Sequence, residues 1–208
     1  MKFQLALDTT DLDQALALAT ALHEQLDIIE VGPLLMYAHG MEAVRALRAA
    51  VPHIPLLADM KIVDRGKEIS QLAFRAGADW VTVLAGTGKS VIHVAATTAH
   101  GMGKRIMLDL IDASSPGQSA LEALSLGVDA LLFHKPADDD NGNLSFLDNW
   151  DMVRSNTTLP IFIAAPLSPE IAPTIASLNP DGIVIDTSMV RGDNPQQALA
   201  NIRALFQK

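Results

Sequence analysis

The sequence has no cysteine among its 208 residues, which excludes disulfide bonds and thiolate metal sites. Aromatic residues make up only 4% of the chain, which argues against recognition of RNA or single strands by stacking. Basic residues are outnumbered by acidic ones, and the net charge of −9 would repel a nucleic-acid backbone. No apolar run is long enough for a signal peptide or a membrane span. We therefore expect a cytoplasmic protein that binds neither nucleic acid nor membrane.

Short apolar runs are abundant, and apolar residues make up 49% of the sequence. The length suits one domain with a sizeable core. Eight runs are apolar without alternation, as expected for strands that are covered on both faces. These runs are residues 3–7, 28–31, 55–58, 80–84, 106–110, 130–133, 161–164 and 182–185.

Stretches with helical spacing of apolar residues lie between and after these runs. They are residues 11–26, 38–50, 67–76, 90–100, 118–126, 147–154, 168–176 and 196–206. Thr10 is the expected N-cap of the first helix. Strands that alternate with helices indicate a parallel sheet, and eight such units favour closure. The sequence thus predicts one domain over residues 1–208, a single (β/α)8 TIM barrel, with one loose acidic loop at residues 137–143.

Polar residues follow the predicted strands, at the end of the barrel where active sites of this fold lie. They are Asp8, Glu30, Asp59 with Lys61 and Asp64, Asp109 with Asp112, His134 with Lys135, and Asp186 with Thr187. Any one of them could simply mark the end of a strand. A shared catalytic role explains better why several carboxylates are expected around a lysine and a histidine on one rim.

These residue types suit reactions at a carbon next to a carbonyl group. Glu30 and Asp59 could hold Mg²⁺, with water completing the shell. Lys61 lies between acidic residues, so its ammonium should stay protonated and could stabilise an oxyanion or deliver a proton to a carbanion. His134 could shuttle protons. Decarboxylation and aldol chemistry both fit, whereas the alternative is a charge network that only ties the third loop together.

One further motif echoes a phosphate-binding loop. Residues 85–90 read AGTGKS, but the first glycine of such a loop would fall at Val83. We interpret the segment as a loop that leads into a helix. The dinucleotide fingerprint G-x-G-x-x-G does not occur.

Five segments carry a resemblance to a known family. They are LALD at residues 5–8, IEVG at 29–32, ADMK at 58–61 with Asp64 and Gly66, VTVL at 81–84, and DLI at 109–111. Through them the chain resembles the orotidine 5′-monophosphate decarboxylase superfamily. The more similar branch contains 3-hexulose-6-phosphate synthase and 3-keto-L-gulonate-6-phosphate decarboxylase. The resemblance runs from Phe3 to about Phe206, and the D-x-K-x-x-D motif is its most specific part.

The resemblance implies a role for each matching residue. Mg²⁺ would be bound by Glu30 and Asp59, and Asp59 also belongs to the catalytic set. The catalytic network would include Asp8 and Lys61, with His134 handling protons.

The resemblance also implies a homodimer with shared active sites. In this branch the residue that matches Asp64 reaches into the site of the partner subunit. Asp64 would therefore act in trans as a catalytic residue.

Three positions favour the synthase over the decarboxylase. This chain has Asp109, Ala137 and Ala164 where the decarboxylases have Glu, Arg and Thr, and here the synthases resemble it. The arginine can guide the proton that quenches an enediolate, so without it the enediolate is better placed to meet an aldehyde such as formaldehyde. The resemblance thus favours an aldol-type enzyme that acts on a keto sugar or sugar phosphate, with a decarboxylase as the alternative.

The chain departs from these relatives where they bind phosphate, in two glycine-containing loops after the seventh and eighth strands. The two loops here read Ala164-Ala165-Pro166 and Asp186-Thr187. Proline lacks an N–H donor, and a β-carbon blocks close approach of the backbone. A carboxylate beside a dianion costs roughly 4 kcal/mol per pair of unit charges at about 4 Å and an effective dielectric of about 20. Arg191 could offset part of this cost.

The expected substrate is accordingly a keto sugar or sugar acid that need not carry phosphate. The residues expected to bind it are Asp8, Asp109, Ala165, Asp186, Thr187 and Arg191. An alternative of another class is a barrel without catalytic activity that binds a sugar or serves as a scaffold. The set of mutually repelling carboxylates argues against that alternative, because such a protein has no need of them.

Overall fold

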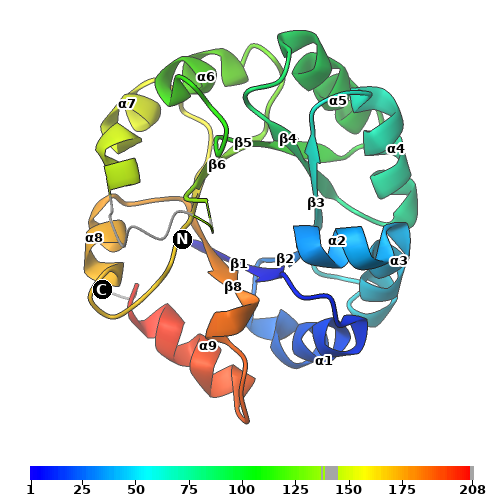
Figure 1. Ribbon diagram of the computed structural model, residues 1–208, viewed down its shortest axis with the longest axis vertical. Helices are drawn as coiled ribbons and strands as arrows, with labels where there is room; N and C mark the ends of the chain where they lie inside the picture. The colour runs from blue at the N-terminus through cyan, green and yellow to red at the C-terminus, as the bar shows by residue number, and fades with distance from the viewer. Residues whose placement is uncertain (137, 139–144, 207–208) are drawn as a thin grey trace.

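Eight parallel strands close into a barrel in sequence order, which confirms the predicted (β/α)8 fold (Figure 1). The computed structural model describes residues 1–136, 138 and 145–206. The strands are β1 (Lys2–Leu7), β2 (Ile28–Val31), β3 (Leu56–Ile62), β4 (Trp80–Leu84), β5 (Arg105–Asp109), β6 (Ala130–His134), β7 (Ile161–Ala164) and β8 (Gly182–Asp186). The last strand pairs with the first, from Lys2 with Gly182 to Ala6 with Asp186.

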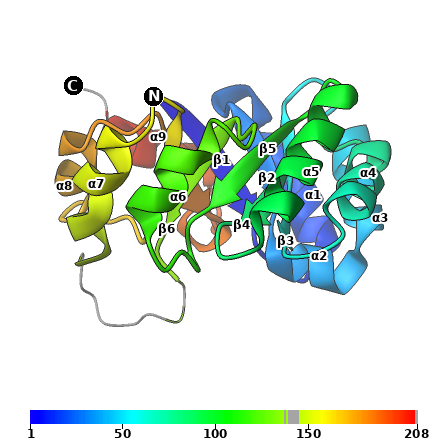
Figure 2. The same ribbon diagram turned by 90° about the horizontal axis from the view of Figure 1, so that it is seen from above.

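Helices form a ring around the barrel, as Figures 1 and 2 show from the end and from the side. They are α1 (Leu12–Leu22), α2 (Pro33–His39), α3 (Met41–Ala50), α4 (Gly66–Ala76), α5 (Lys89–Gly101), α6 (Pro116–Ala123), α7 (Trp150–Ser155), α8 (Ala172–Ser177) and α9 (Pro195–Ala204). Short 3₁₀ turns are η1 (His23–Gln25), η2 (Ser145–Asn149) and η3 (Thr187–Met189). No helix in the part of the chain that the structure describes is long and apolar enough to cross a membrane. The cytoplasmic location expected from the sequence stays a prediction.

Two details of the predicted helices are wrong. The N-cap of α1 is Asp11, not Thr10, because the Asp11 carboxylate accepts the N–H of Gln14 at 3.0 Å. The helix expected over residues 38–50 begins only at Met41 as α3, because Gly40 separates it from α2, which the sequence pattern did not predict. Gly40 has a φ of +57°, a backbone conformation that interrupts a helix and that glycine adopts readily.

The third strand is longer than predicted, since it continues past Ala58 to Ile62. Its pairing with β4 shifts in register between these two residues. Lys61 lies inside the irregular stretch with a φ of 42°, which is unusual for a residue other than glycine. The prediction stopped early because Asp59 and Lys61 look like the polar end of a strand.

The strands bury one face against the helices and the other inside the barrel. Residues that alternate along the strands separate into two apolar clusters, one shared with the helices and one confined to the strands. The inner cluster contains Ala6, Ile28, Leu57, Trp80, Met107, Ala130, Leu132, Phe162 and Val184. Beyond this apolar layer, the next inward residues toward the strand ends are polar, and this change in polarity positions the candidate site.

The N-terminal end of the barrel is fastened by Arg48 of α3. Its guanidinium donates to the carbonyl of Gly77 at 2.9 Å and forms an ion pair with Asp79. Asp79 also accepts the N–H of Leu56 at 3.0 Å and the ammonium of Lys104 at 2.7 Å. Burial alone would raise the pKa of Asp79, but these donors hold it below its usual value. One carboxylate thus joins the starts of β3, β4 and β5.

Replacing Arg48 with alanine should lower the free energy of unfolding by about 2 to 3 kcal/mol, because partly buried acceptors lose their donors. Urea denaturation monitored by circular dichroism measures the change. The control is Arg45→Ala, which removes an exposed ion pair to Glu42 and should cost about 0.5 kcal/mol or less. Equal losses in the two variants would contradict the fastening role of Arg48.

Candidate active site

An arc of carboxylates lies at the C-terminal ends of four neighbouring strands. Asp186 ends β8 and Asp8 follows β1, whereas Glu30 and Asp59 lie within β2 and β3, and these four strands are adjacent around the barrel. Ala6 of β1 pairs with Asp186 on one side and with Glu30 on the other. The pKa of Asp8 is raised by burial and by the charges of Asp186 and Asp59. The structure therefore brings these predicted site residues together.

Lys61 supplies the positive charge of this rim. Its Nζ lies 3.0 Å from Oδ2 of Asp59 and 3.0 Å from Oδ2 of Asp109. Burial disfavours the ammonium, but the two carboxylates outweigh burial and raise the pKa of Lys61 above its ordinary value. Lys61 stays protonated, as its acidic neighbours in the sequence suggested. An ammonium held in this way can face a developing oxyanion.

Two buried polar residues support the site and were missed in the sequence. The Thr82 hydroxyl donates to Asp59 at 2.5 Å and accepts the N–H of Lys61 at 2.8 Å. The Gln4 amide donates to Glu30 at 2.5 Å, while its oxygen is buried without a hydrogen-bond partner among the described residues. Both are polar residues at inward positions of otherwise apolar strands. That signal becomes readable only once the inward face of each strand is known.

Glu30 and Asp59 form a pair of buried carboxylates that fits a hard divalent cation. Each side chain belongs to a residue that is only 5% exposed. Burial and the charge of Asp59 raise the pKa of Glu30 to about 8, although the Gln4 hydrogen bond opposes the shift. A cation would relieve this repulsion. Within the described ranges, no group of three histidine or acidic side chains is arranged to hold a metal, so the pair offers part of a shell.

Asp109 is fully buried and links the lysine to the histidine. Its Oδ2 lies 3.0 Å from Nδ1 of His134 and 3.0 Å from Nζ of Lys61, while Oδ1 accepts the N–H of Ile111. Burial would raise the pKa of Asp109, but His134 and Lys61 lower it. An ionised Asp109 favours the His134 tautomer with its proton on Nδ1, which leaves Nε2 as an acceptor.

Three of the residues expected to bind the phosphate end of a substrate differ in their exposure to solvent. Thr187 is buried, and its hydroxyl donates to the Ala6 carbonyl at 2.7 Å and accepts the N–H of Asp8 at 2.8 Å. Ala165 is also buried, whereas Arg191 is exposed.

Of two other positions in the sequence argument, Asp64 and Ala137, the structure describes only the first. Asp64 follows β3 and is exposed, and its carboxylate makes no hydrogen bond or ion pair within the described part of this chain. Ala137, with most of the predicted loop at residues 137–143, lies outside the residues that the structure describes.

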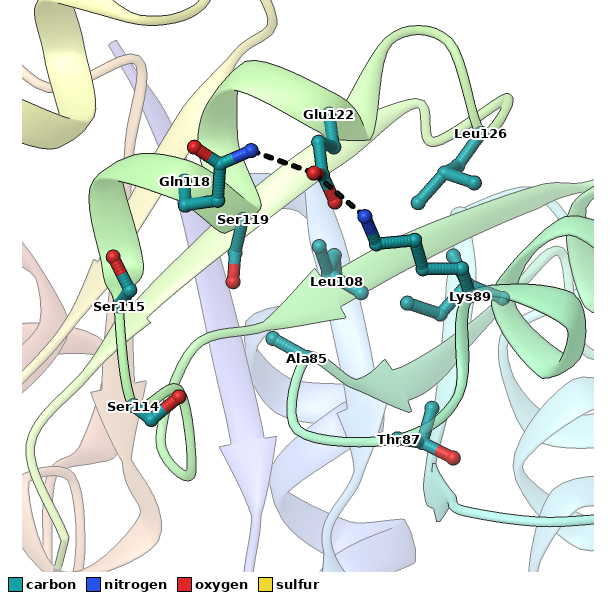
Figure 3. A pocket seen from close by; sticks show the side chains of 11 residues that line it. Ala85, Thr87, Lys89, Leu108, Ser114, Ser115, Gln118, Ser119, Glu122 and Leu126 are labelled. Atoms are coloured by element: carbon teal, nitrogen blue, oxygen red, sulfur yellow. Dashed lines mark hydrogen bonds and ion pairs between the residues drawn. The ribbon is translucent and has the colours of Figure 1, made fainter.

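A cavity of about 190 Å³ lies elsewhere, between α5 and α6 (Figure 3). Lys89 at its edge is paired with Glu122 at 2.7 Å, and Gln118 donates to the same carboxylate at 2.6 Å. The AGTGKS segment contributes to its wall as a loop that leads into α5, as interpreted from the sequence. The charged groups of this cavity pair with one another, so the cavity is a weaker candidate for an active site than the rim is.

Residues 1–154 match the model of the orotidine 5′-phosphate decarboxylase / HUMPS family. Over its full length the chain is 30% identical to 3-hexulose-6-phosphate synthase of Staphylococcus epidermidis, of which 99% is covered. The crystal structure of 3-hexulose-6-phosphate synthase from Salmonella typhimurium is 30% identical, with a TM-score of 0.91 and coverage of 99% and 98%. That of 3-keto-L-gulonate-6-phosphate decarboxylase from Vibrio cholerae is 28% identical, with a TM-score of 0.87 and coverage of 99% and 96%.

The raised pKa of Glu30 predicts how stability depends on pH in metal-free protein. The folded state keeps a proton on Glu30 up to about pH 8, whereas its ordinary pKa is 4.5. Between these values the folded state binds more protons, so the free energy of unfolding should fall as the pH rises. Glu30→Gln should flatten that slope, measured by urea denaturation in EDTA from about pH 5 to about pH 8.

The matched control is Glu42→Gln, since Glu42 is an exposed carboxylate of α3. This variant should keep the slope of the parent protein. An unchanged slope in Glu30→Gln would show that Glu30 is ionised in the folded state throughout this range.

Proposed function

The chain belongs to the orotidine 5′-phosphate decarboxylase / HUMPS family, and from this premise we propose that it cleaves or forms a carbon–carbon bond of a keto sugar through an enediolate. Membership of this family makes the chain an enzyme, and its similarity to 3-hexulose-6-phosphate synthases makes it a lyase. The observation that carries the proposal is the Lys61 ammonium, held 3.0 Å from both Asp59 and Asp109. A fixed cation at this position stabilises negative charge on the oxygens of an enediolate.

The reaction begins with removal of a proton from the carbon next to the carbonyl group. His134 is suited to take this proton on Nε2, because Asp109 lies 3.0 Å from its Nδ1. The enediolate carbon then attacks an aldehyde such as formaldehyde, and the new alkoxide takes up a proton. In the reverse direction the same groups release the aldehyde. Asp109 is a positioning residue here, since its oxygens are occupied by Lys61, His134 and Ile111.

Glu30 and Asp59 are the residues that would hold Mg²⁺ in this proposal. When bound, the ion supplies Lewis-acid polarisation of the substrate's carbonyl and hydroxyl oxygens. The repulsion that raises the pKa of Glu30 to about 8 supports this assignment. Addition of Mg²⁺ should therefore stabilise the protein more strongly as the pH rises.

An aldol-type reaction is favoured over decarboxylation by the relatives that are 30% identical, which are named 3-hexulose-6-phosphate synthase. A decarboxylase is the second candidate, because one of the similar structures is a 3-keto-L-gulonate-6-phosphate decarboxylase. Both reactions pass through an enediolate and need the same lysine.

We further propose a homodimer in which Asp64 completes the site of the partner subunit. The Asp64 carboxylate is exposed and has no partner within the described ranges of its own chain. Its neighbour Val63 is 57% exposed, which suits a contact surface. Arg65 has a φ of 51°, so the backbone turns sharply after Asp64. These features support a loop that points away from its own barrel.

Lys61→Ala should reduce kcat/KM by a factor of about 10² to 10³, because the enediolate loses its fixed cation. The assay follows formaldehyde uptake or release with phosphorylated and unphosphorylated ketoses in the presence of Mg²⁺. Lys89→Ala, at the outer cavity, is the control and should retain activity within about twofold.

Other outcomes of this assay distinguish the alternatives. Release of CO₂ from a keto sugar acid, without formaldehyde chemistry, would favour the decarboxylase. Calorimetric binding of a ketose without any turnover would favour a sugar-binding barrel and contradict the proposed reaction.

Mixing the inactive variants Lys61→Ala and Asp64→Ala should restore activity if the sites are shared. Random exchange of subunits gives half of the dimers as hybrids, each with one complete site, so about a quarter of the parent activity should return. Size-exclusion chromatography with light scattering checks the dimer. Absence of recovery after demonstrated subunit exchange would place Asp64 in the site of its own chain.

A further inference from the structure

The rim formed by the ends of β7, β8 and β1 carries negative charge, which is unusual at this place in a (β/α)8 barrel. In (β/α)8 barrels, the loops after strands seven and eight and a short extra helix frequently bind phosphate. Here the short helix is η3, which directly follows β8. Asp186 precedes it, and Oδ1 of Asp186 accepts the N–H of Ser188 at 2.7 Å. The chain's own carboxylate therefore occupies a backbone donor that an anion would need.

A second carboxylate does the same at the adjacent strand. Asp8 follows β1, and its Oδ1 accepts the N–H of Leu34 at 2.8 Å, at the start of α2. A β-carbon at Gly32 would lie 2.9 Å from the Asp8 backbone, so glycine allows the two strand ends to approach closely. One backbone donor at the start of α2 is thus occupied by a carboxylate of the chain as well.

Three further groups near this rim offer little to an anion. The Thr187 hydroxyl donates to the carbonyl of Ala6 and accepts the N–H of Asp8, so it is already engaged as donor and as acceptor at the end of β1. Pro166, the second residue after β7, has no N–H to offer. Arg191 is exposed and forms no ion pair with Asp186 in the described part of the chain.

The two carboxylates also act on each other through their charges. Asp186 pairs in register with Ala6, and Asp8 lies two residues further along the chain, directly after β1. After burial, the charge of Asp186 is among the causes that raise the pKa of Asp8. A phosphate dianion here would meet two negative groups. A sugar hydroxyl would instead donate to them, since an ionised carboxylate only accepts hydrogen bonds.

We infer that Asp186 is a specificity-determining residue that, with Asp8, accepts the distal hydroxyl groups of an unphosphorylated keto sugar and excludes a terminal phosphate. The inference rests on the proposed function and deepens it by naming the substrate class. It assigns substrate choice to β8 and β1, apart from the lysine and histidine that carry the reaction.

The test compares a ketose with the same ketose bearing a terminal phosphate, as kcat/KM for the formaldehyde reaction. The parent enzyme should favour the unphosphorylated sugar by about tenfold or more. Asp186→Gly frees the Ser188 N–H and should shift this ratio toward the phosphate by about tenfold or more. Asp186→Asn keeps a capping oxygen without the charge and should shift the ratio in the same direction by less.

The control is Asp193→Asn, which removes one exposed carboxylate from the following loop and should leave the ratio unchanged. A preference for the phosphorylated ketose in the parent enzyme, unaltered by Asp186→Asn, would overturn the inference and leave the proposed reaction intact.

A binding measurement separates this inference from the proposed function. Isothermal titration with inorganic phosphate should show binding to Asp186→Gly and none to the parent protein at the same concentration. This result would support the role of Asp186 even if no ketose were turned over, in which case the proposed reaction alone would fail. Phosphate binding of equal strength to both proteins would contradict the inference. Thermal unfolding of each variant confirms that it is folded.

Discussion

Closure of the barrel is the constraint on which the rest of this structure depends. Once β8 pairs with β1, the register fixes which residues of every strand point inward. The inner face is apolar around Leu57 and Phe162 and becomes polar toward the strand ends. Glu30 and Asp186 flank Ala6 because the ladders place them there. The gathering of acidic groups on one rim is therefore a consequence of register rather than of any local motif.

The carboxylates of this rim are stabilised by a neighbouring positive charge and by hydrogen-bond donors. Lys61 offsets Asp59 and Asp109, and Thr82 and His134 supply further hydrogen bonds. The irregular stretch of β3, with its positive φ at Lys61, is where the strand departs from regular pairing. A strained backbone of this kind persists where the surrounding contacts fix it, and such positions concentrate at functional sites. Glu30 is the exception, since Gln4 alone among the described residues donates a hydrogen bond to it.

The barrel and the charged residues of its rim could be predicted from the sequence, because both follow from patterns that are local in the chain. Apolar runs reveal strands, and Asp59 and Lys61 stand close together in the chain. The contacts of Gln4 with Glu30 and of Lys61 with Thr82 join residues 26 and 21 positions apart, which no local pattern encodes. Asp11 rather than Thr10 caps α1, because the choice between adjacent capping residues depends on backbone geometry.

The carboxylates of this rim differ in the groups that surround them, and their proposed roles differ accordingly. Carboxylates next to Lys61 and His134 are those that we propose for the reaction, whereas Asp8 and Asp186 each accept a backbone N–H group. The two sets lie on different strands, so one can change while the other is kept. The proposed reaction thus rests on residues of β3, β5 and β6. The substrate choice that we infer depends instead on β8 and β1, where Asp186 and Asp8 lie.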